Sequence, residues 1–191
     1  MNILKPEPDS SIVVFGLGTV GLTAVMAAKY MKVRQIIAVD IQPSKFDVAK
    51  EVGATDIVNS REVDDIVAHI KKLAGGTGPD FAVDCTGVPK VIEDMLNCLG
   101  MFGTGATVGV APAGAKISID PLQWLLYSKK YVGCREGDSL PSEYVPKLVE
   151  MQRNGEFPVE KIVKVYDYKD MKQALHDLHE GTVVKPVIRW Q

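Results

Sequence analysis

Three glycines near the start of the chain have the spacing of a phosphate-binding turn. Gly16, Gly18 and Gly21 stand in the sequence Gly-Leu-Gly-Thr-Val-Gly, directly after the apolar run Ile12–Phe15. Gly16 permits a tight turn, Gly18 lets the backbone approach a pyrophosphate without a Cβ clash, and Gly21 lets a helix pack close to the preceding strand. The helix start then offers unpaired N–H groups to the phosphates. The motif predicts a dinucleotide site; a glycine-rich turn without a ligand is the alternative.

An acidic residue follows the motif at the distance expected for ribose recognition. Asp40 lies 19 residues after Gly21, at the end of a second apolar run. A carboxylate there accepts hydrogen bonds from both hydroxyls of an adenosine ribose and repels a 2′-phosphate. Ile41 and Gln42 follow it and supply no arginine for such a phosphate, which favours NAD over NADP. Lys45 lies one helical turn further on, within reach of the same ribose, although an isolated lysine is often only a surface residue.

The cysteines and histidines predict neither a catalytic residue nor a metal site. The cysteines are odd in number and have no CxxC spacing, which predicts reduced thiols in an intracellular protein: Cys85, Cys98 and Cys134. Nothing near Cys85 marks it as a nucleophile, so we expect a buried residue that closes a strand. His176 and His179 are three residues apart on a predicted helix, but they lack the further ligands that a zinc site needs.

Composition and charge narrow the possible partners. The 191 residues are 46% hydrophobic and 24% charged, which is typical of a globular protein. Lys+Arg number 22 and Asp+Glu number 24, without the basic surplus that nucleic-acid binding requires. The uncharged stretch from Ser10 to Ala28 has the length of a membrane span, but its glycines fit a strand, a turn and a helix better. We therefore expect a cytoplasmic protein that binds neither nucleic acid nor membranes.

Short apolar strands alternate with amphipathic helices along the chain. Strands are predicted at Ile12–Phe15, Arg34–Asp40, Asp56–Val58, Phe81–Cys85, Ala106–Val110 and Tyr131–Cys134. Helices are predicted at Thr19–Met31, Pro43–Gly53, a segment capped by Ser60, Pro89–Gly100 and Pro121–Ser128. This alternation predicts the α/β class, with a doubly wound parallel six-stranded sheet in the order 3-2-1-4-5-6, the Rossmann fold.

The loops after two central strands are expected to wall the ligand site. Ligands of open α/β sheets bind at the carboxyl ends of the strands. The residues at the ends of strands four and five are Thr86, Gly87, Val108, Gly109 and Val110. Such loops occur in every protein of this class. The prediction that they line the ligand site therefore rests on their position alone and not on a specific motif.

The regular alternation of apolar strands and amphipathic helices changes towards the end of the chain. Lys116–Ile119 alternates polar and apolar residues, which is typical of a half-exposed strand. The final segments predict a helix near Ser142–Asn154, a strand at Lys161–Asp167, a helix at Lys169–Glu180 and a strand at Lys185–Trp190. We expect residues 1–154 to form the dinucleotide-binding domain and residues 155–191 a short C-terminal α/β tail.

Several stretches together resemble the zinc-dependent medium-chain alcohol dehydrogenases. They are GLGTVGL, VDIQPSKFDVAKEVGATDIVN, DFAVDCTG, VPKLVEMQRNGEF and KPVIRW, and ILKPEP and CTGVP resemble the aryl- or benzyl-alcohol dehydrogenases. The resemblance implies NAD, bound through Gly16, Gly18, Thr19, Val20, Gly21, Asp40 and Lys45. It implies that the nicotinamide carboxamide binds backbone groups at Val108, Cys134 and Glu136, and that Lys185 reaches the pyrophosphate. It also implies a homodimer in which the strand Lys116–Ile119 pairs with its copy.

The sequence departs from this family in one large respect. Family members begin with a barrel-like catalytic domain that supplies the zinc ligands and the proton-relay hydroxyl, and this sequence contains no counterpart of it. We therefore expect NAD(H) binding without zinc-dependent turnover by this chain alone. Residues 155–191, which pack on that domain in the family, are expected to be exposed or covered by a partner. A regulatory or scaffold protein and a zinc-independent enzyme that reuses the fold are the alternatives.

Overall fold

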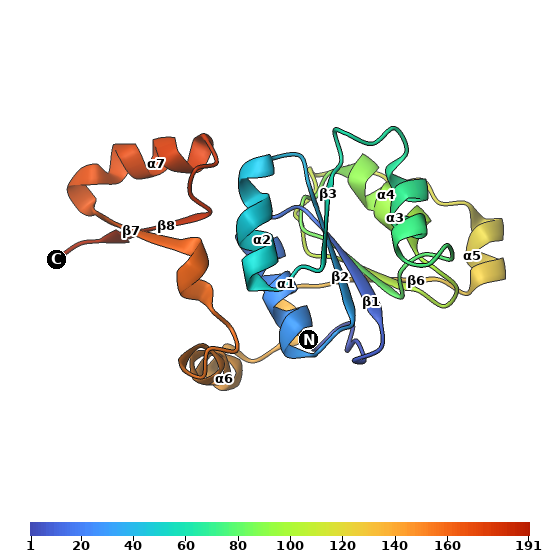
Figure 1. The fold of residues 1–191 in the computed structure, drawn as a ribbon, viewed down its shortest axis with the longest axis horizontal. Helices are drawn as coiled ribbons and strands as arrows, with labels where there is room; N and C mark the ends of the chain where they lie inside the picture. Colours follow the sequence, from blue (N-terminus) through green and yellow to red (C-terminus); the bar gives the residue numbers. More distant parts are fainter.

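A parallel six-stranded sheet forms the centre of the computed structural model, which describes residues 1–191 (Figure 1). Its strands are β1 (Ser11–Phe15), β2 (Gln35–Asp40), β3 (Asp56–Asn59), β4 (Phe81–Asp84), β5 (Thr104–Thr107) and β6 (Lys130–Gly133). They are ordered β3-β2-β1-β4-β5-β6, and all neighbouring strands are parallel. The doubly wound fold predicted from the alternation of strands and helices is confirmed.

Helices cover both faces of this sheet. They are α1 (Thr19–Tyr30), the short η1 (Pro43–Lys45), α2 (Phe46–Val52), α3 (Ile66–Leu73), α4 (Pro89–Cys98) and α5 (Pro121–Tyr127). All five residues of β1 are buried, as expected for a central strand of a parallel sheet. Ile12 and Val14 join the core under α1 and α2, whereas Val13 and Phe15 join the core under α3 and α4.

The last fifth of the chain forms a smaller unit beside α2 (Figure 1). After α6 (Pro141–Arg153) come η3 (Val159–Ile162), β7 (Val163–Asp167), η4 (Tyr168–Asp170), α7 (Met171–His179) and β8 (Lys185–Arg189). β7 and β8 pair in parallel as a separate two-stranded sheet. Tyr166, Ala174 and Val183 form its own small core. No helix of the structure is both long enough and apolar enough to span a membrane.

Two element boundaries differ from the sequence prediction. Ser60 does not cap a helix, because α3 begins only at Ile66; its N–H instead donates to the Asp40 carbonyl (3.1 Å) and prolongs the pairing of β3 with β2. Asp65 caps α3 instead, through a bond from the Ala68 N–H to its carboxylate (2.9 Å). β5 ends at Thr107 rather than at Val110, because the next two N–H groups turn to the Asp84 carbonyl.

The predicted strand at Lys116–Ile119 is not formed within this chain. The segment pairs with none of the eight strands of the structure. Its one anchored N–H, that of Ser118, donates to the Glu93 carboxylate (2.8 Å). An alternating pattern makes a strand only where a neighbouring edge supplies hydrogen-bond partners, and no edge of this chain does so here.

Candidate functional site

The glycine motif forms the turn between β1 and α1, and its three glycines face different surroundings. Gly16 has a φ of +89° and donates its N–H to the Val39 carbonyl (2.8 Å). A Cβ at Gly21 would lie 1.7 Å from the Gly16 carbonyl oxygen, so the close packing of α1 requires this glycine. A Cβ at Gly18 would meet no atom within 4 Å. The fold therefore needs Gly16 and Gly21, whereas the space around Gly18 is open to a ligand.

The N-terminus of α1 is free to bind an anion. Gly18 is its N-cap residue and supplies no side-chain cap, and the first turn contains no acidic residue. The first N–H groups of a helix have no partner within it and carry the positive end of the helix dipole. Gly18, Thr19 and Val20 thus present uncompensated donors beside an open space, as a phosphate site requires.

Asp40 lies at the end of β2 and is bound to the glycine turn. Its Oδ2 accepts a hydrogen bond from the Leu17 N–H (2.6 Å). Its Oδ1 accepts from the N–H groups of Ile41 (2.7 Å) and Gln42 (2.9 Å). The carboxylate therefore fixes the position of the turn relative to β2, a role that the sequence does not predict, in addition to the predicted ribose contact.

A cavity of about 520 Å³ joins the glycine turn to the ends of β2 and β4. Gly16, Gly18, Asp40, Lys45 and Thr86 all line it. Five of the residues singled out from the sequence thus share one space, large enough for part of a nucleotide.

Lys45 lies in this cavity wall and is committed to the C-terminal tail. The residue is buried, and its Nζ donates to the Gly181 carbonyl (2.9 Å), which the Ser44 hydroxyl also reaches (3.3 Å). Burial lowers the pKa of Lys45, and the nearby Asp40 carboxylate opposes that shift. This contact links residues that are 136 positions apart and holds the tail against η1.

The tail also brings Lys185 to the start of α1. The Thr19 hydroxyl donates to the Val184 carbonyl (3.5 Å), next to the first residue of β8. Thr19 and Lys185 line one cavity of about 410 Å³, together with Pro186. Lys185 therefore lines a cavity beside the uncapped helix end, and its contact with a pyrophosphate stays a prediction.

Asp84 organises the strand-end loops and was not singled out from the sequence. It is fully buried at the end of β4. Its Oδ1 accepts from the N–H and hydroxyl of Thr86 (2.9 and 2.6 Å), and its Oδ2 accepts from the Thr107 hydroxyl (2.8 Å) and the Gly87 N–H (3.2 Å). The signal that could have identified it in the sequence is a carboxylate at the end of an apolar strand.

The strand-end loops lie in close contact with each other. A Cβ at Gly109 would be 2.1 Å from the Gly87 nitrogen, and one at Gly87 would be 2.4 Å from the Val110 carbonyl oxygen. Both glycines are therefore required by this contact rather than by a ligand. Val110 is 92% exposed and lines none of the three cavities of this site, whereas Val108 lines one of them.

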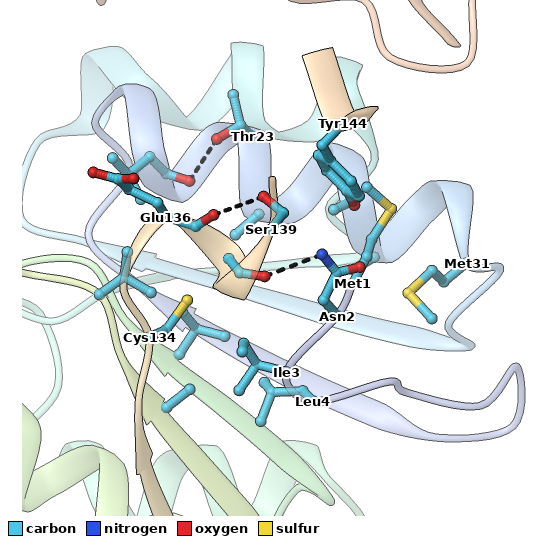
Figure 2. A pocket seen from close by; sticks show the side chains of 18 of the residues that line it. Met1, Asn2, Ile3, Leu4, Thr23, Met31, Cys134, Glu136, Ser139 and Tyr144 are labelled. Atoms are coloured by element: carbon cyan, nitrogen blue, oxygen red, sulfur yellow. Dashed lines mark hydrogen bonds between the residues drawn. The ribbon is translucent and has the colours of Figure 1, made fainter. Parts of the chain in front are cut away.

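A second cavity of about 490 Å³ lies on the other side of α1 (Figure 2). It is mostly apolar, and its lining includes Val20 of the glycine motif together with Val108, Cys134 and Glu136, the positions that the family resemblance implies for the nicotinamide carboxamide. Figure 2 shows Cys134 and Glu136 facing the N-terminal residues 1–4 across this space. The Asn2 side-chain amide donates to the Gly137 carbonyl (3.0 Å) and fixes these residues against the loop after β6.

Three separate cavities lie around the start of α1. Gly18 lines the cavity of about 520 Å³, Thr19 that of about 410 Å³ and Val20 that of about 490 Å³. The arrangement suits an extended ligand whose anionic centre lies at the helix N-terminus and whose two ends occupy opposite sides of α1.

The cysteines have the character of structural residues. Burial raises the pKa of the Cys85 thiol to about 12, and the Asp84 charge acts in the same direction. Burial also raises the pKa of the Cys98 thiol to about 12. Both thiols therefore stay protonated near neutral pH. Cys98 is buried, whereas Cys85 is only partly buried and directly follows β4, which ends at Asp84 rather than at the predicted Cys85. No three His, Cys, Asp or Glu residues of the structure are grouped so as to hold a metal ion, and this includes His176 and His179.

Known proteins share this fold and sequence over the whole chain. A family model described as zinc-binding dehydrogenase matches residues 19–153. The S-(hydroxymethyl)glutathione dehydrogenase of Synechocystis is 34% identical over 99% of this chain and 52% of its own length. An alcohol dehydrogenase zinc-binding domain protein from Burkholderia ambifaria is 40% identical with a TM-score of 0.94, and 51% of it is covered. The benzyl alcohol dehydrogenase of Acinetobacter calcoaceticus is 39% identical with a TM-score of 0.94, and 52% of it is covered. The chain thus spans about half the length of these relatives.

Proposed function

Because the chain belongs to the zinc-binding dehydrogenase family, we propose that it binds NAD(H) as the cofactor-binding half of an alcohol dehydrogenase-like oxidoreductase. The observation that carries this proposal is the start of α1. There an uncapped helix end meets the open space at Gly18, with Asp40 on one side and Lys185 on the other. This combination of donors, charge and space suits the centre of a dinucleotide.

Different groups of residues contact different parts of the cofactor. The turn Gly16–Gly21 and Lys185 hold the pyrophosphate, and Asp40 holds the adenosine ribose with Lys45 nearby. The loops at Thr86–Gly87 and Val108–Gly109 wall the site, while backbone groups of Val108, Cys134 and Glu136 hold the nicotinamide carboxamide. When bound, the nicotinamide accepts or donates a hydride. The chain's own contribution is to orient that ring and to place the anionic centre on the helix end.

The residues of this chain do not fit a zinc ion, although the family description names one. A catalytic zinc takes three protein ligands, and no cluster of three His, Cys, Asp or Glu residues exists here. We propose that turnover needs residues this chain does not supply.

Alcohol oxidation by the purified chain should therefore be absent. With benzyl alcohol, NAD⁺ and added Zn²⁺, we expect no NADH absorbance at 340 nm above a protein-free blank. Sustained NADH formation that scales with chain concentration would contradict this prediction. Its persistence with a zinc chelator in place of the added Zn²⁺ would favour a zinc-independent enzyme.

NADPH should bind more weakly than NADH by about tenfold or more, a free-energy difference of about 1.4 kcal/mol. The reason is that Asp40 would face the 2′-phosphate with a like charge, and neither Ile41 nor Gln42 offers a compensating cation. Separate calorimetric titrations of the chain with NADH and with NADPH measure the ratio of the two affinities.

Asp40→Asn is the matched variant, because it removes the charge while keeping an acceptor for the Leu17 N–H. This variant should reduce the difference in affinity between NADH and NADPH. Equal affinities of the unaltered chain for NADH and NADPH would remove Asp40 from the ribose site.

We further propose that two copies of the chain associate beside Lys116–Ile119. The adjoining helix α5 has no buried residue. Leu122, Leu125 and Leu126 on it are 61%, 75% and 64% exposed. An apolar face of this kind, next to a segment that has the strand pattern but lacks a strand partner, supports a symmetric contact with a second copy.

Leu125→Glu should convert the dimer to a monomer, because the contact would bury a charge opposite its own copy. Light scattering after size exclusion, at tens of micromolar chain, reports the mass. The exposed Lys72→Glu is the control and should stay dimeric. A monomeric unaltered chain would refute the dimer.

The cellular location of the chain and a partner for residues 155–191 stay predictions. A cytoplasmic location follows from the cysteine usage alone. A partner that covers residues 155–191 is supported by exposed apolar side chains there, among them Val165, Leu175 and Trp190.

A further inference from the structure

The cavity beside Asp40 has a second, mostly apolar end away from the glycine turn. Its wall there consists of Ile66, the first residue of α3, and of Val88 and Val91 at the start of α4. Val88, Val91 and Asp94 recur every three residues and therefore lie on one side of α4. The cavity thus ends in an apolar slot with an acidic residue on its wall.

Asp94 has one carboxylate oxygen in an ion pair and one without a partner. Its Oδ1 accepts from Lys90, which lies one turn earlier on α4. Its Oδ2 receives no hydrogen bond from the protein, although the side chain is only 15% exposed. A sheltered carboxylate oxygen in a cavity wall is an acceptor available to a ligand.

The proposed orientation of the cofactor leaves only one part of it for this slot. With the pyrophosphate at Gly18 and the adenosine ribose at Asp40, the base must continue from the ribose into the apolar end. Ile66, Val88 and Val91 offer apolar side chains for contact with a purine ring.

We propose that Asp94 selects a 6-aminopurine by accepting a hydrogen bond from the exocyclic amine of the base, an inference that rests on the proposed function. A carboxylate only accepts hydrogen bonds, so an amine at this position gains a charge-assisted bond. A 6-oxopurine would present a carbonyl oxygen to the same carboxylate and would lose that bond. Lys90 holds the other oxygen and keeps the carboxylate oriented.

The experiment compares NADH with reduced nicotinamide hypoxanthine dinucleotide, whose base carries a 6-oxo group in place of the 6-amino group and a proton on N1. Both are titrated into the full chain by calorimetry, together with the variants Asp94→Ala, Asp94→Asn and Lys90→Ala. The unaltered chain should prefer NADH by about tenfold. Asp94→Ala should abolish the preference by weakening NADH alone. Asp94→Asn keeps an acceptor oxygen and should retain part of the preference for NADH. Lys90→Ala should retain most of this preference.

The outcomes separate this inference from the proposed function. NADH binding with an equal affinity for the hypoxanthine analogue, or a preference that survives in Asp94→Ala, would overturn the role of Asp94 and leave NAD(H) binding intact. Failure of both dinucleotides to bind a folded chain would instead overturn the proposed function and this inference with it. Thermal unfolding of each variant verifies that the fold persists, as expected for a side chain whose sole protein partner is the exposed Lys90.

Discussion

Gly21→Ala should strongly destabilise the dinucleotide-binding domain. Gly18→Ala should leave the domain as stable as before but should weaken its binding of NADH. A Cβ at Gly21 would lie 1.7 Å from the Gly16 carbonyl oxygen, a backbone atom that α1 cannot avoid without moving. We expect a loss of about 3 kcal/mol in the free energy of unfolding. Urea unfolding followed by circular dichroism measures it.

The Gly18 variant tests the other half of this prediction. The backbone of Gly18 has a φ of −72° and a ψ of −168°, which alanine adopts freely, and a Cβ there would meet no protein atom within 4 Å. The unfolding midpoint of this variant should therefore match that of the unaltered chain. Its NADH affinity should fall by about 100-fold, or about 2.7 kcal/mol, because the methyl group occupies the approach of the pyrophosphate. A stable Gly21→Ala chain, or tight NADH binding by Gly18→Ala, would contradict this account of the turn.

Asp84→Ala should cost about 3 kcal/mol in the free energy of unfolding. The substitution leaves the N–H groups of Thr86 and Gly87 and two hydroxyls without the buried carboxylate that accepts from them. The loops at the ends of β4 and β5 should loosen, so NADH binding should weaken as well. Urea unfolding measures the first effect and NADH fluorescence the second.

Thr107→Val serves as the matched control for Asp84. It removes one of the four donor groups and should cost only about 1 kcal/mol. Asp84→Asn should fall between the two, since an amide offers one oxygen to these donors but directs its NH₂ group at the others. An Asp84→Ala chain as stable as the Thr107→Val chain would show that the carboxylate does not organise the loops.

Local pattern predicted those features that depend on neighbours in sequence. The continuous apolar runs identified β1 and β2, and glycine spacing identified the turn between β1 and α1. The strand order followed from the alternation of strands with helices, because right-handed crossovers leave few topologies. Asp40 was identified from its distance after the glycines, since both belong to one βαβ unit.

Contacts between distant segments could not be predicted in this way. Lys45 looked free to reach a ribose, yet its ammonium is bound to Gly181 in the tail. Lys129 carries no signal of burial in the sequence, yet it is buried and donates to the carbonyls of Leu96 (3.1 Å) and Asn97 (3.4 Å) at the end of α4. Asp94 was not singled out because its meaning depends on the cavity that α3 closes from the other side.

The strand predicted at Lys116–Ile119 is not formed within this chain. Lys116–Ile119 has a strand-like alternation, but no edge of this sheet pairs with it. Periodicity reports which residues would face a core or solvent and says nothing about whether a partner edge is present. The same limit applies to the apolar face of α5, whose partner the association experiment must identify.

The most direct test of the central claim is a calorimetric titration of the purified chain with NADH, beside the Gly18→Ala variant. This variant is a better control than Asp40→Ala, because Asp40 also holds the Leu17 N–H and its loss would disturb the turn itself. We predict saturable binding of one NADH per chain that is lost in the folded Gly18→Ala variant. A folded chain that does not bind NADH, or equal binding by the variant, would contradict the assignment of the glycine turn and α1 as a cofactor site.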